Sequence, residues 1–204
     1  MNFKSFKEKV KKHPLFREDV ARLFSAGLQT MRNQLLRWKK KGLIVQLRKG
    51  LYLLSKEERA LPASKELIAA NLYQPSYISL ETALSYYKLI PERIVSVTSV
   101  TTRKTKTFQN QEGLFTYRHL KKNAYFGFKA QRDEYGYPYF LAEPEKALLD
   151  YLYLNLASIK ANDKNYFADS LRLQNRSSLN KAKLMRYAKR YGINKLLKVA
   201  GNLK

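Results

Sequence analysis

The sequence predicts an α+β protein in two parts, and three observations support that prediction. Apolar residues recur at intervals of three and four near both ends of the chain, a pattern typical of amphipathic helices. The middle holds β-branched and alternating runs typical of strands, of which residues 113–120 are the clearest. The chain of 204 residues has 40 Lys and Arg against 16 Asp and Glu. This excess of positive charge is distributed unevenly along the chain.

Two basic ends flank a nearly neutral middle. Residues 1–54 carry a formal net charge of +11, residues 55–154 carry +3, and residues 155–204 carry +10. Such an excess attracts polyanions: nucleic acid, an anionic membrane surface or an acidic protein. We therefore expect a first domain over residues 1–55 and a second, mixed α+β domain over residues 56–204 that ends in basic helices.

The first part begins with short helices. Residues 2–12 place apolar side chains at helical spacing, and His13-Pro14 ends that helix. We expect a second helix over residues 17–24. A turn at Gly27 follows, where glycine tolerates the positive φ that such a turn often needs.

A third helix is expected over residues 29–41, and its two faces differ. Met31, Leu35 and Trp38 form one apolar stripe, which we expect to be buried, and Gly42 closes the helix. The opposite face is polar. The candidates for contact with DNA on this helix are Gln29, Thr30, Arg32, Asn33, Arg37, Lys39 and Lys40. Lysines at a helix C-terminus also complement the helix dipole, so that alternative stays open.

Two strand-like runs, residues 43–47 and 51–54, follow this helix. A basic turn with Arg48 and Lys49 joins them. This order of elements is typical of a winged helix-turn-helix, in which the third helix enters the major groove and the hairpin tip reaches phosphates or the minor groove. We expect Arg48 and Lys49 to contact DNA there, although a winged helix also serves protein contacts.

The remaining residues predict a mixed α/β domain with a helical carboxy-terminal end. Ser79 is a plausible N-cap, and Pro144 suits the first position of a helix, with Glu143 and Glu145 at its positive end. The basic run that starts at Arg103 predicts a solvated connection. We expect strands over residues 94–102, 113–120, 125–128 and 137–141, and helices over 64–72, 79–87, 144–155, 166–173, 180–191 and 195–199.

The sequence offers little for catalysis or for a metal. It has no cysteine and only two histidines, His13 and His119, which argues against a zinc site. Glu143, Glu145 and Lys146 loosely resemble the Asp…Glu-x-Lys arrangement of nucleases, but no acidic residue lies two positions before Lys146. We expect no enzymatic activity, no metal and no cofactor.

The chain also lacks signals for a membrane. No stretch approaches the roughly 18 apolar residues that span a bilayer, and the basic amino terminus is not followed by the apolar region of a secretory signal. The lack of cysteine fits a reducing compartment. We expect a cytoplasmic protein with no membrane partner.

Five ordered segments between residues 10 and 155 resemble one bacterial family. They are RKGLY at 48–52, PSYISLETAL at 75–84, VTSVTTR at 97–103, FTYRH at 115–119 and AEPEKALLD at 142–150. Together they resemble the AbiEi antitoxins, transcriptional regulators of type IV toxin–antitoxin systems that act in abortive infection, a form of phage defence.

This resemblance implies a function and two partners. It implies a winged helix that represses its own operon at double-stranded operator DNA, which we expect to carry inverted repeats. It also implies a second domain that counteracts a nucleotidyltransferase-fold toxin from the same operon, with or without a stable complex. Two alternatives stay open: a winged-helix regulator with a ligand-sensing central domain and no toxin, and a basic nuclease.

Overall fold

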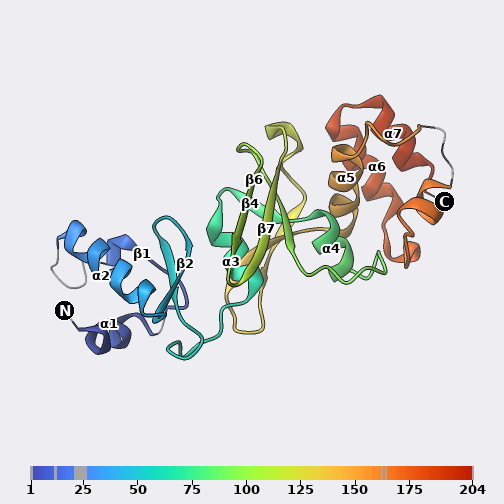
Figure 1. Cartoon of the computed structure of the whole chain (residues 1–204). Helices are drawn as coiled ribbons and strands as arrows, with labels where there is room; N and C mark the ends of the chain where they lie inside the picture. The colour runs from blue at the N-terminus through green and yellow to red at the C-terminus, as the bar shows by residue number, and fades with distance from the viewer. Residues whose placement is uncertain (1, 12, 21–26, 162, 164, 204) are drawn as a thin grey trace.

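The structure is a computed structural model that describes residues 2–11, 13–20, 27–161, 163 and 165–203. Over those residues it is an α+β protein with one sheet of three strands and one of six. Figure 1 shows three parts in chain order: an amino-terminal part with the small sheet, a central part with the large sheet, and a helical carboxy-terminal part at the opposite end.

The amino-terminal part combines two helices with a three-stranded sheet. Its elements are α1 (Phe3–Val10), β1 (Phe16–Arg17), α2 (Leu28–Lys40), β2 (Ile44–Arg48) and β3 (Leu51–Leu54), and the antiparallel strand order is β1-β3-β2. The predicted apolar stripe of α2 is confirmed, because Met31, Leu35 and Trp38 are all buried. Trp38 packs against Phe6 of α1, with ring centroids 4.6 Å apart.

The turns that close α2 and the hairpin are also as predicted, whereas two other expectations are wrong. Gly42 and Gly50 have φ of 71° and 78°, a region that favours glycine. Gly27, in contrast, has φ of −62° as the N-cap of α2. Arg17 starts no helix and pairs with Leu51 in the sheet.

Strand β1 forms where the expected helix would start, because its aromatic residue Phe16 is buried. Phe16 stacks on Tyr52 of β3 with ring centroids 6.0 Å apart, and burial of an aromatic residue in a sheet outweighs local helical spacing. Only residues 18–20 form a short 3₁₀ turn. The rest of the expected second helix falls on residues 21–26, which lie outside the described residues.

The β2–β3 hairpin is buried on both faces. One face packs with α1 and α2 and contributes Ile44, Tyr52 and Leu54. The other face belongs to the core of the large sheet and contributes Leu47, Leu51 and Leu53. Asn110 Nδ2 also donates to the carbonyl of Leu47 at 3.3 Å. The hairpin therefore joins the amino-terminal part to the central part.

The central part is a mixed six-stranded sheet. Its strand order is β6-β7-β5-β4-β9-β8, with β5–β7 and β4–β9 parallel and the other pairs antiparallel. The strands are β4 (Ser76–Ile78), β5 (Val97–Thr101), β6 (Lys106–Asn110), β7 (Gly113–His119), β8 (Phe128–Arg132) and β9 (Pro138–Ala142). Helices α3 (Lys65–Leu72), α4 (Leu80–Tyr86) and α5 (Pro144–Leu154) pack on it.

The strand predictions hold only in part. Strand β7 is confirmed, but β5 begins three residues later than expected, and of residues 125–128 only Phe128 is in a strand. Strands β4 and β6 were not predicted. Strand β6 lies at the sheet edge with a mostly polar sequence, and edge strands lack the apolar alternation that a sequence pattern detects.

The carboxy-terminal part consists of α6 (Lys181–Tyr191) and α7 (Asn194–Gly201), as predicted, with short turns η2 (Lys122–Ala124), η3 (Tyr166–Ser170) and η4 (Arg176–Ser178) elsewhere in the chain. The expected helix over 166–173 is only the π-helical turn η3. Helix α6 packs on α5 (Figure 1). Every helix in the described ranges is too short or too polar to traverse a lipid bilayer.

Candidate nucleic-acid interface

The outer face of α2 is polar, basic and open to solvent. All seven candidates that the sequence indicated on this helix are exposed: Gln29, Thr30, Arg32, Asn33, Arg37, Lys39 and Lys40. Two apolar side chains, Leu28 and Leu36, are also exposed, with 47% and 53% of their surface accessible. The predicted helix phase is therefore right, because the stripe that faces inward and the face that faces outward are the expected ones.

Neighbouring side chains hold some of these candidates in place. Arg32 Nε pairs with Glu18 at 2.8 Å, and Gln29 Nε2 donates to Asn33 Oδ1 at 3.2 Å. Lys39 Nζ donates to Gln46 on the hairpin at 2.7 Å. Over the described residues, Arg37 and Lys40 have no polar side-chain partner and remain available to a ligand.

The two candidates of the hairpin turn are in different surroundings. Lys49 is exposed at the tip, whereas Arg48 is half-buried and donates from Nη1 to the carbonyl of Lys49 at 2.9 Å. Arg48 also lines a cavity with Arg17 and Arg103. Sequence reasoning did not group these three arginines, because they come from separate strands and loops.

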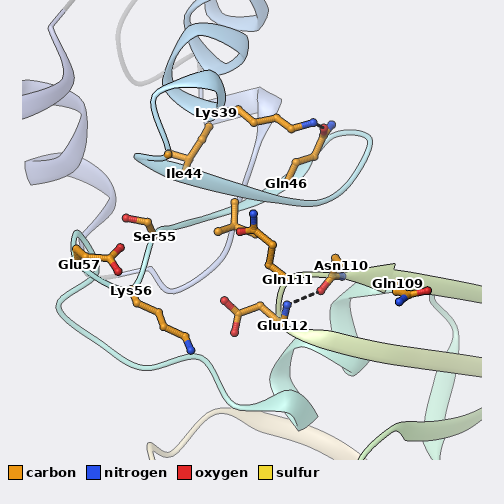
Figure 2. A pocket seen from close by; sticks show the side chains of 12 residues that line it. Lys39, Ile44, Gln46, Ser55, Lys56, Glu57, Gln109, Asn110, Gln111 and Glu112 are labelled. Atoms are coloured by element: carbon orange, nitrogen blue, oxygen red, sulfur yellow. Dashed lines mark hydrogen bonds between the residues drawn. The ribbon is translucent and has the colours of Figure 1, made fainter.

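A second, larger cleft lies beside β2 (Figure 2). Its volume is about 580 Å³, and it lies between the hairpin, the segment after β3 and the β6–β7 turn. Its charged lining residues are Lys39, Lys56, Glu57 and Glu112, which balance in charge. The β6–β7 turn is stabilised by a hydrogen bond in which the backbone N–H of Glu112 donates to Asn110 Oδ1 at 2.9 Å. This cleft offers no net attraction to a polyanion.

The second part of the chain holds a buried ion pair on α5. Lys146 Nζ contacts Asp150 Oδ1, and both side chains are fully inaccessible to solvent. Tyr77 OH and Ser79 Oγ donate to Asp150 Oδ2 at 3.0 and 2.8 Å, and Tyr191 OH donates to Oδ1 at 2.6 Å. Every oxygen of this buried carboxylate therefore has a donor, which is what makes its burial tolerable.

Side chains from two segments that the sequence analysis singled out form this network. Tyr77 and Ser79 come from residues 75–84, and Lys146 and Asp150 come from residues 142–150. Burial lowers the pKa of Lys146 and raises the pKa of Tyr77. The predicted capping role of the Ser79 side chain is wrong, because Ser79 lies at the N-cap of α4 but its hydroxyl binds Asp150 instead.

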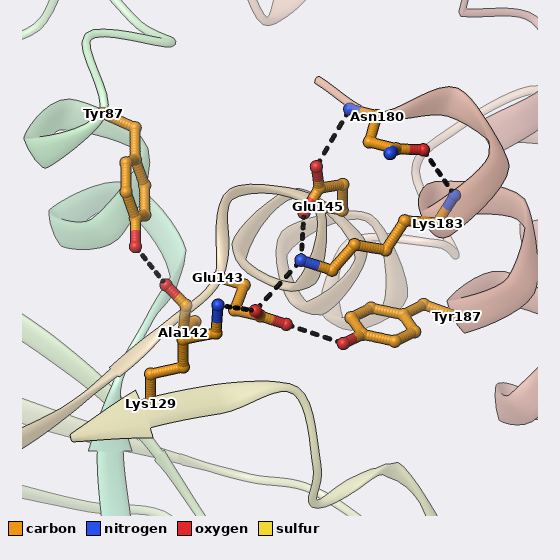
Figure 3. Close-up of polar contacts among 8 residues, drawn as sticks. All are labelled: Tyr87, Lys129, Ala142, Glu143, Glu145, Asn180, Lys183 and Tyr187. Carbon is orange, nitrogen blue, oxygen red and sulfur yellow. Dashed lines mark hydrogen bonds and ion pairs between the residues drawn. The ribbon is translucent and has the colours of Figure 1, made fainter. Parts of the chain in front are cut away.

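The two glutamates at the start of α5 are ion-paired (Figure 3). Glu143 binds Lys129 at 2.8 Å and Lys183 at 3.0 Å, and it accepts from Tyr187 OH at 2.6 Å. Lys183 also reaches Glu145 at 3.2 Å. Pro144 occupies the first helical position as predicted, but the Glu143 side chain makes no capping bond.

These contacts describe a structural cluster. Burial alone would raise the pKa of the Glu143 carboxyl, but hydrogen bonds from Lys129, Tyr187 and Lys183 outweigh it and lower that pKa to about 2. Within the described part of the chain, no group of three or more His, Cys, Asp or Glu side chains is placed to hold a metal ion. The glutamates thus fasten α6 to the start of α5.

Comparison with known proteins adds no family assignment. No family model matches the chain, and no curated protein matches it. The class of protein is therefore inferred from the geometry above and from the segments that resemble the AbiEi family.

Proposed function

We propose that the chain is a DNA-binding transcriptional autorepressor whose amino-terminal part is a winged helix-turn-helix. The observation that supports this most directly is the face of α2: seven polar candidates are all exposed, while the opposite stripe is buried. The hairpin β2–β3 follows directly with exposed Lys49 at its tip. The net charge of +11 over residues 1–54 supplies the general attraction to a duplex.

The spacing on α2 suits readout of base edges. Gln29, Asn33 and Arg37 follow one another at intervals of four residues, so they lie along one line of the helix. Asparagine and glutamine make two hydrogen bonds to adenine, and arginine makes two to guanine in the major groove. Lys40 in the last turn of α2 and Lys49 at the hairpin tip are exposed and would contact phosphates, which fix position without reading sequence.

The antitoxin activity is a second proposal, and it rests on the resemblance to AbiEi proteins. The part from residue 56 onward would counteract a nucleotidyltransferase-fold toxin encoded beside it. The buried pair Lys146–Asp150 is inaccessible to any partner. The exposed basic side chains of α6, such as Lys181, Arg186 and Lys189, are accessible.

Fluorescence anisotropy with a duplex from the chain's own promoter region tests the first proposal. Asn33→Ala and Arg37→Ala should each cost about 1–3 kcal/mol at the operator and less on random duplex. Lys40→Ala should weaken binding to both duplexes alike and reduce the salt slope by about 1.

Lys189→Ala is the matched control, because it removes an exposed charge from α6, at the opposite end of the molecule from α2 (Figure 1). It should leave the ratio of operator to random binding unchanged. Wild-type affinity for the operator in both Asn33→Ala and Arg37→Ala, each folded, would show that α2 does not read bases.

Growth rescue tests the antitoxin proposal separately. The full chain with Arg37→Ala should still restore growth when the neighbouring nucleotidyltransferase-fold reading frame is expressed, because the proposed neutralising part does not include α2. A full chain that binds its operator but does not rescue growth would contradict the antitoxin proposal alone.

A further inference from the structure

A small basic cavity lies where the amino-terminal hairpin meets the large sheet. Its volume is about 310 Å³. Arg17 of β1 and Arg48 of β2 line it from one side, and Arg103, after β5, and Lys106 of β6 line it from the other. Tyr73, at the end of α3, forms part of the wall. None of the described residues that line it is acidic.

These four cations are not neutralised by the protein. Across the described residues, none of them forms an ion pair. Glu18 follows Arg17 in the chain, but its carboxylate binds Arg32 on α2 at 2.8 Å. The four positive charges therefore face one cavity without a compensating carboxylate, which costs free energy through mutual repulsion.

Neutral groups nevertheless hold the cations in position. Arg103 Nη1 donates to the carbonyl of Gln74 at 3.2 Å, and its guanidinium lies 4.5 Å from the centroid of the Tyr73 ring. Lys106 Nζ lies 5.7 Å from the same ring centroid. Such cation–π contacts orient a charged group and leave its charge intact.

Arg48 is the most constrained of the four. Its Nε is buried, and among the described residues no acceptor reaches it; a buried donor without a partner is costly. Burial, followed by the charges of Arg17 and Arg103, lowers the pKa of its guanidinium. An anion in the cavity would relieve this repulsion.

We propose that this cavity binds a small phosphate-bearing anion, either free phosphate or a phosphate monoester. Guanidinium groups match the oxygens of phosphate in planar, charge-assisted pairs. A phosphate monoester carries about −1.5 to −2 charges at neutral pH, more than a carboxylate. The cavity is near the lower limit of about 300 Å³ for small-molecule sites, which suits a compact ligand.

The ligand would bridge two parts of the molecule. Arg17 and Arg48 belong to the small sheet, whereas Lys106 belongs to the large one and Arg103 lies in the connection between its strands β5 and β6. A bound phosphate would therefore stabilise the contact between the hairpin and the sheet. This inference goes beyond the proposed function, because it needs neither DNA nor a toxin.

Calorimetric titration of the full chain tests it, with inorganic phosphate and a nucleoside 5′-monophosphate as probes and chloride at the same ionic strength as the reference. Wild-type protein should bind at least one phosphate probe and show a higher unfolding midpoint with it than in chloride. Arg103→Gln and Lys106→Gln should each raise the Kd about tenfold. Both side chains are exposed, so these substitutions leave the core intact.

Lys104→Gln is the matched control, since Lys104 is an exposed cation of the same loop that does not line the cavity. It should leave the Kd unchanged. An equal loss in Lys104→Gln would show only a general attraction to anions and would overturn the proposal.

A duplex titration separates the small anion from the DNA backbone. If the wild type binds neither phosphate probe, while Arg103→Gln and Lys106→Gln weaken binding to random duplex, the cations serve DNA and the proposal is wrong. No phosphate binding and no effect on duplex would overturn it as well. The proposed function is tested separately. If the wild type binds its operator in the absence of phosphate, that function stands whatever the phosphate titration shows.

Discussion

The two ends of the chain carry nearly equal positive charge, +11 over residues 1–54 and +10 over residues 155–204, yet the ion pairs of their basic helices differ, since Arg32 of α2 has one carboxylate partner and Lys183 of α6 has two. In the carboxy-terminal part, Lys183 of α6 binds both Glu143 and Glu145 of α5. Both helices also keep cations that face solvent: Arg37 and Lys40 on α2, and Lys181, Arg186 and Lys189 on α6. Net charge alone does not locate a ligand surface. What matters is whether carboxylates oppose the cations.

Individual ion pairs also differ in how much they stabilise the fold. The Lys146–Asp150 pair is fully buried, whereas Arg32 of the Arg32–Glu18 pair has 46% of its side chain exposed. A buried pair depends on both partners, because the loss of one leaves an uncompensated charge. An exposed pair is screened by water and salt and contributes little.

The largest expected effect is that of Lys146→Met. This substitution leaves Asp150 charged and buried with only neutral donors, so the free energy of unfolding should fall by about 3–5 kcal/mol. Urea denaturation at neutral pH measures it. Lys183→Met is the matched control and should cost less, because Lys183 has 23% of its side chain exposed, Glu143 retains Lys129 and Tyr187 as partners, and Glu145 retains the backbone N–H of Asn180. Equal stability of Lys146→Met and wild type would remove the distinction between the two kinds of pair.

An intermediate effect is expected from Glu143→Gln, and it depends on pH. Because the folded state lowers the pKa of Glu143 from 4.5 to about 2, this carboxylate stabilises the fold above about pH 4.5 and loses that contribution as the pH falls toward 2. Since Lys129, one of its partners, has 68% of its side chain exposed, solvent screens part of the gain. We expect a loss of about 1–2 kcal/mol at pH 7.

Unfolding curves between pH 7 and pH 2 check this prediction. The free energy of unfolding of Glu143→Gln should fall less steeply below pH 5 than that of the wild type. Glu134→Gln, which changes an exposed glutamate, should follow the wild-type curve. A Glu143→Gln curve parallel to wild type over this range would mean that the three hydrogen bonds do not favour the charged carboxyl.

The smallest effect on stability is expected from Arg32→Ala. The pair with Glu18 is exposed on its arginine side, so its loss should cost less than about 1 kcal/mol, and less still at high salt. Thermal melts at low and high ionic strength measure this. If the free energy of unfolding fell by several kcal/mol independently of salt, the Arg32–Glu18 pair would behave as a buried pair, and this prediction would be wrong.

The sequence predicted those features that depend on neighbouring residues. Helix α2, its apolar stripe, the glycine that ends it and the position of Pro144 are all readable from local spacing and backbone preference. The candidates on α2 followed from the same helical phase, and all of them are exposed. Local rules were sufficient here because packing does not override them.

The sequence did not predict features that depend on distant pairs. Tyr77 and Asp150 are 73 positions apart, and no local sequence pattern predicts their hydrogen bond. The expected helix at Arg17 failed because Phe16 is buried against Tyr52 in the sheet. The cavity lined by Arg48 and Arg103 is a product of topology, since those residues meet only once the hairpin packs on the large sheet.

Because the β2–β3 hairpin packs into two cores, the amino-terminal part cannot be moved to another protein by a simple cut. A chimera made by cutting after residue 55 would take Leu47, Leu51 and Leu53 away from the sheet that covers them. The transplanted module would present an apolar face to solvent and would tend to self-associate. A recipient scaffold would therefore have to supply a matching sheet edge, so the hairpin and its supporting strands can be exchanged only as one unit.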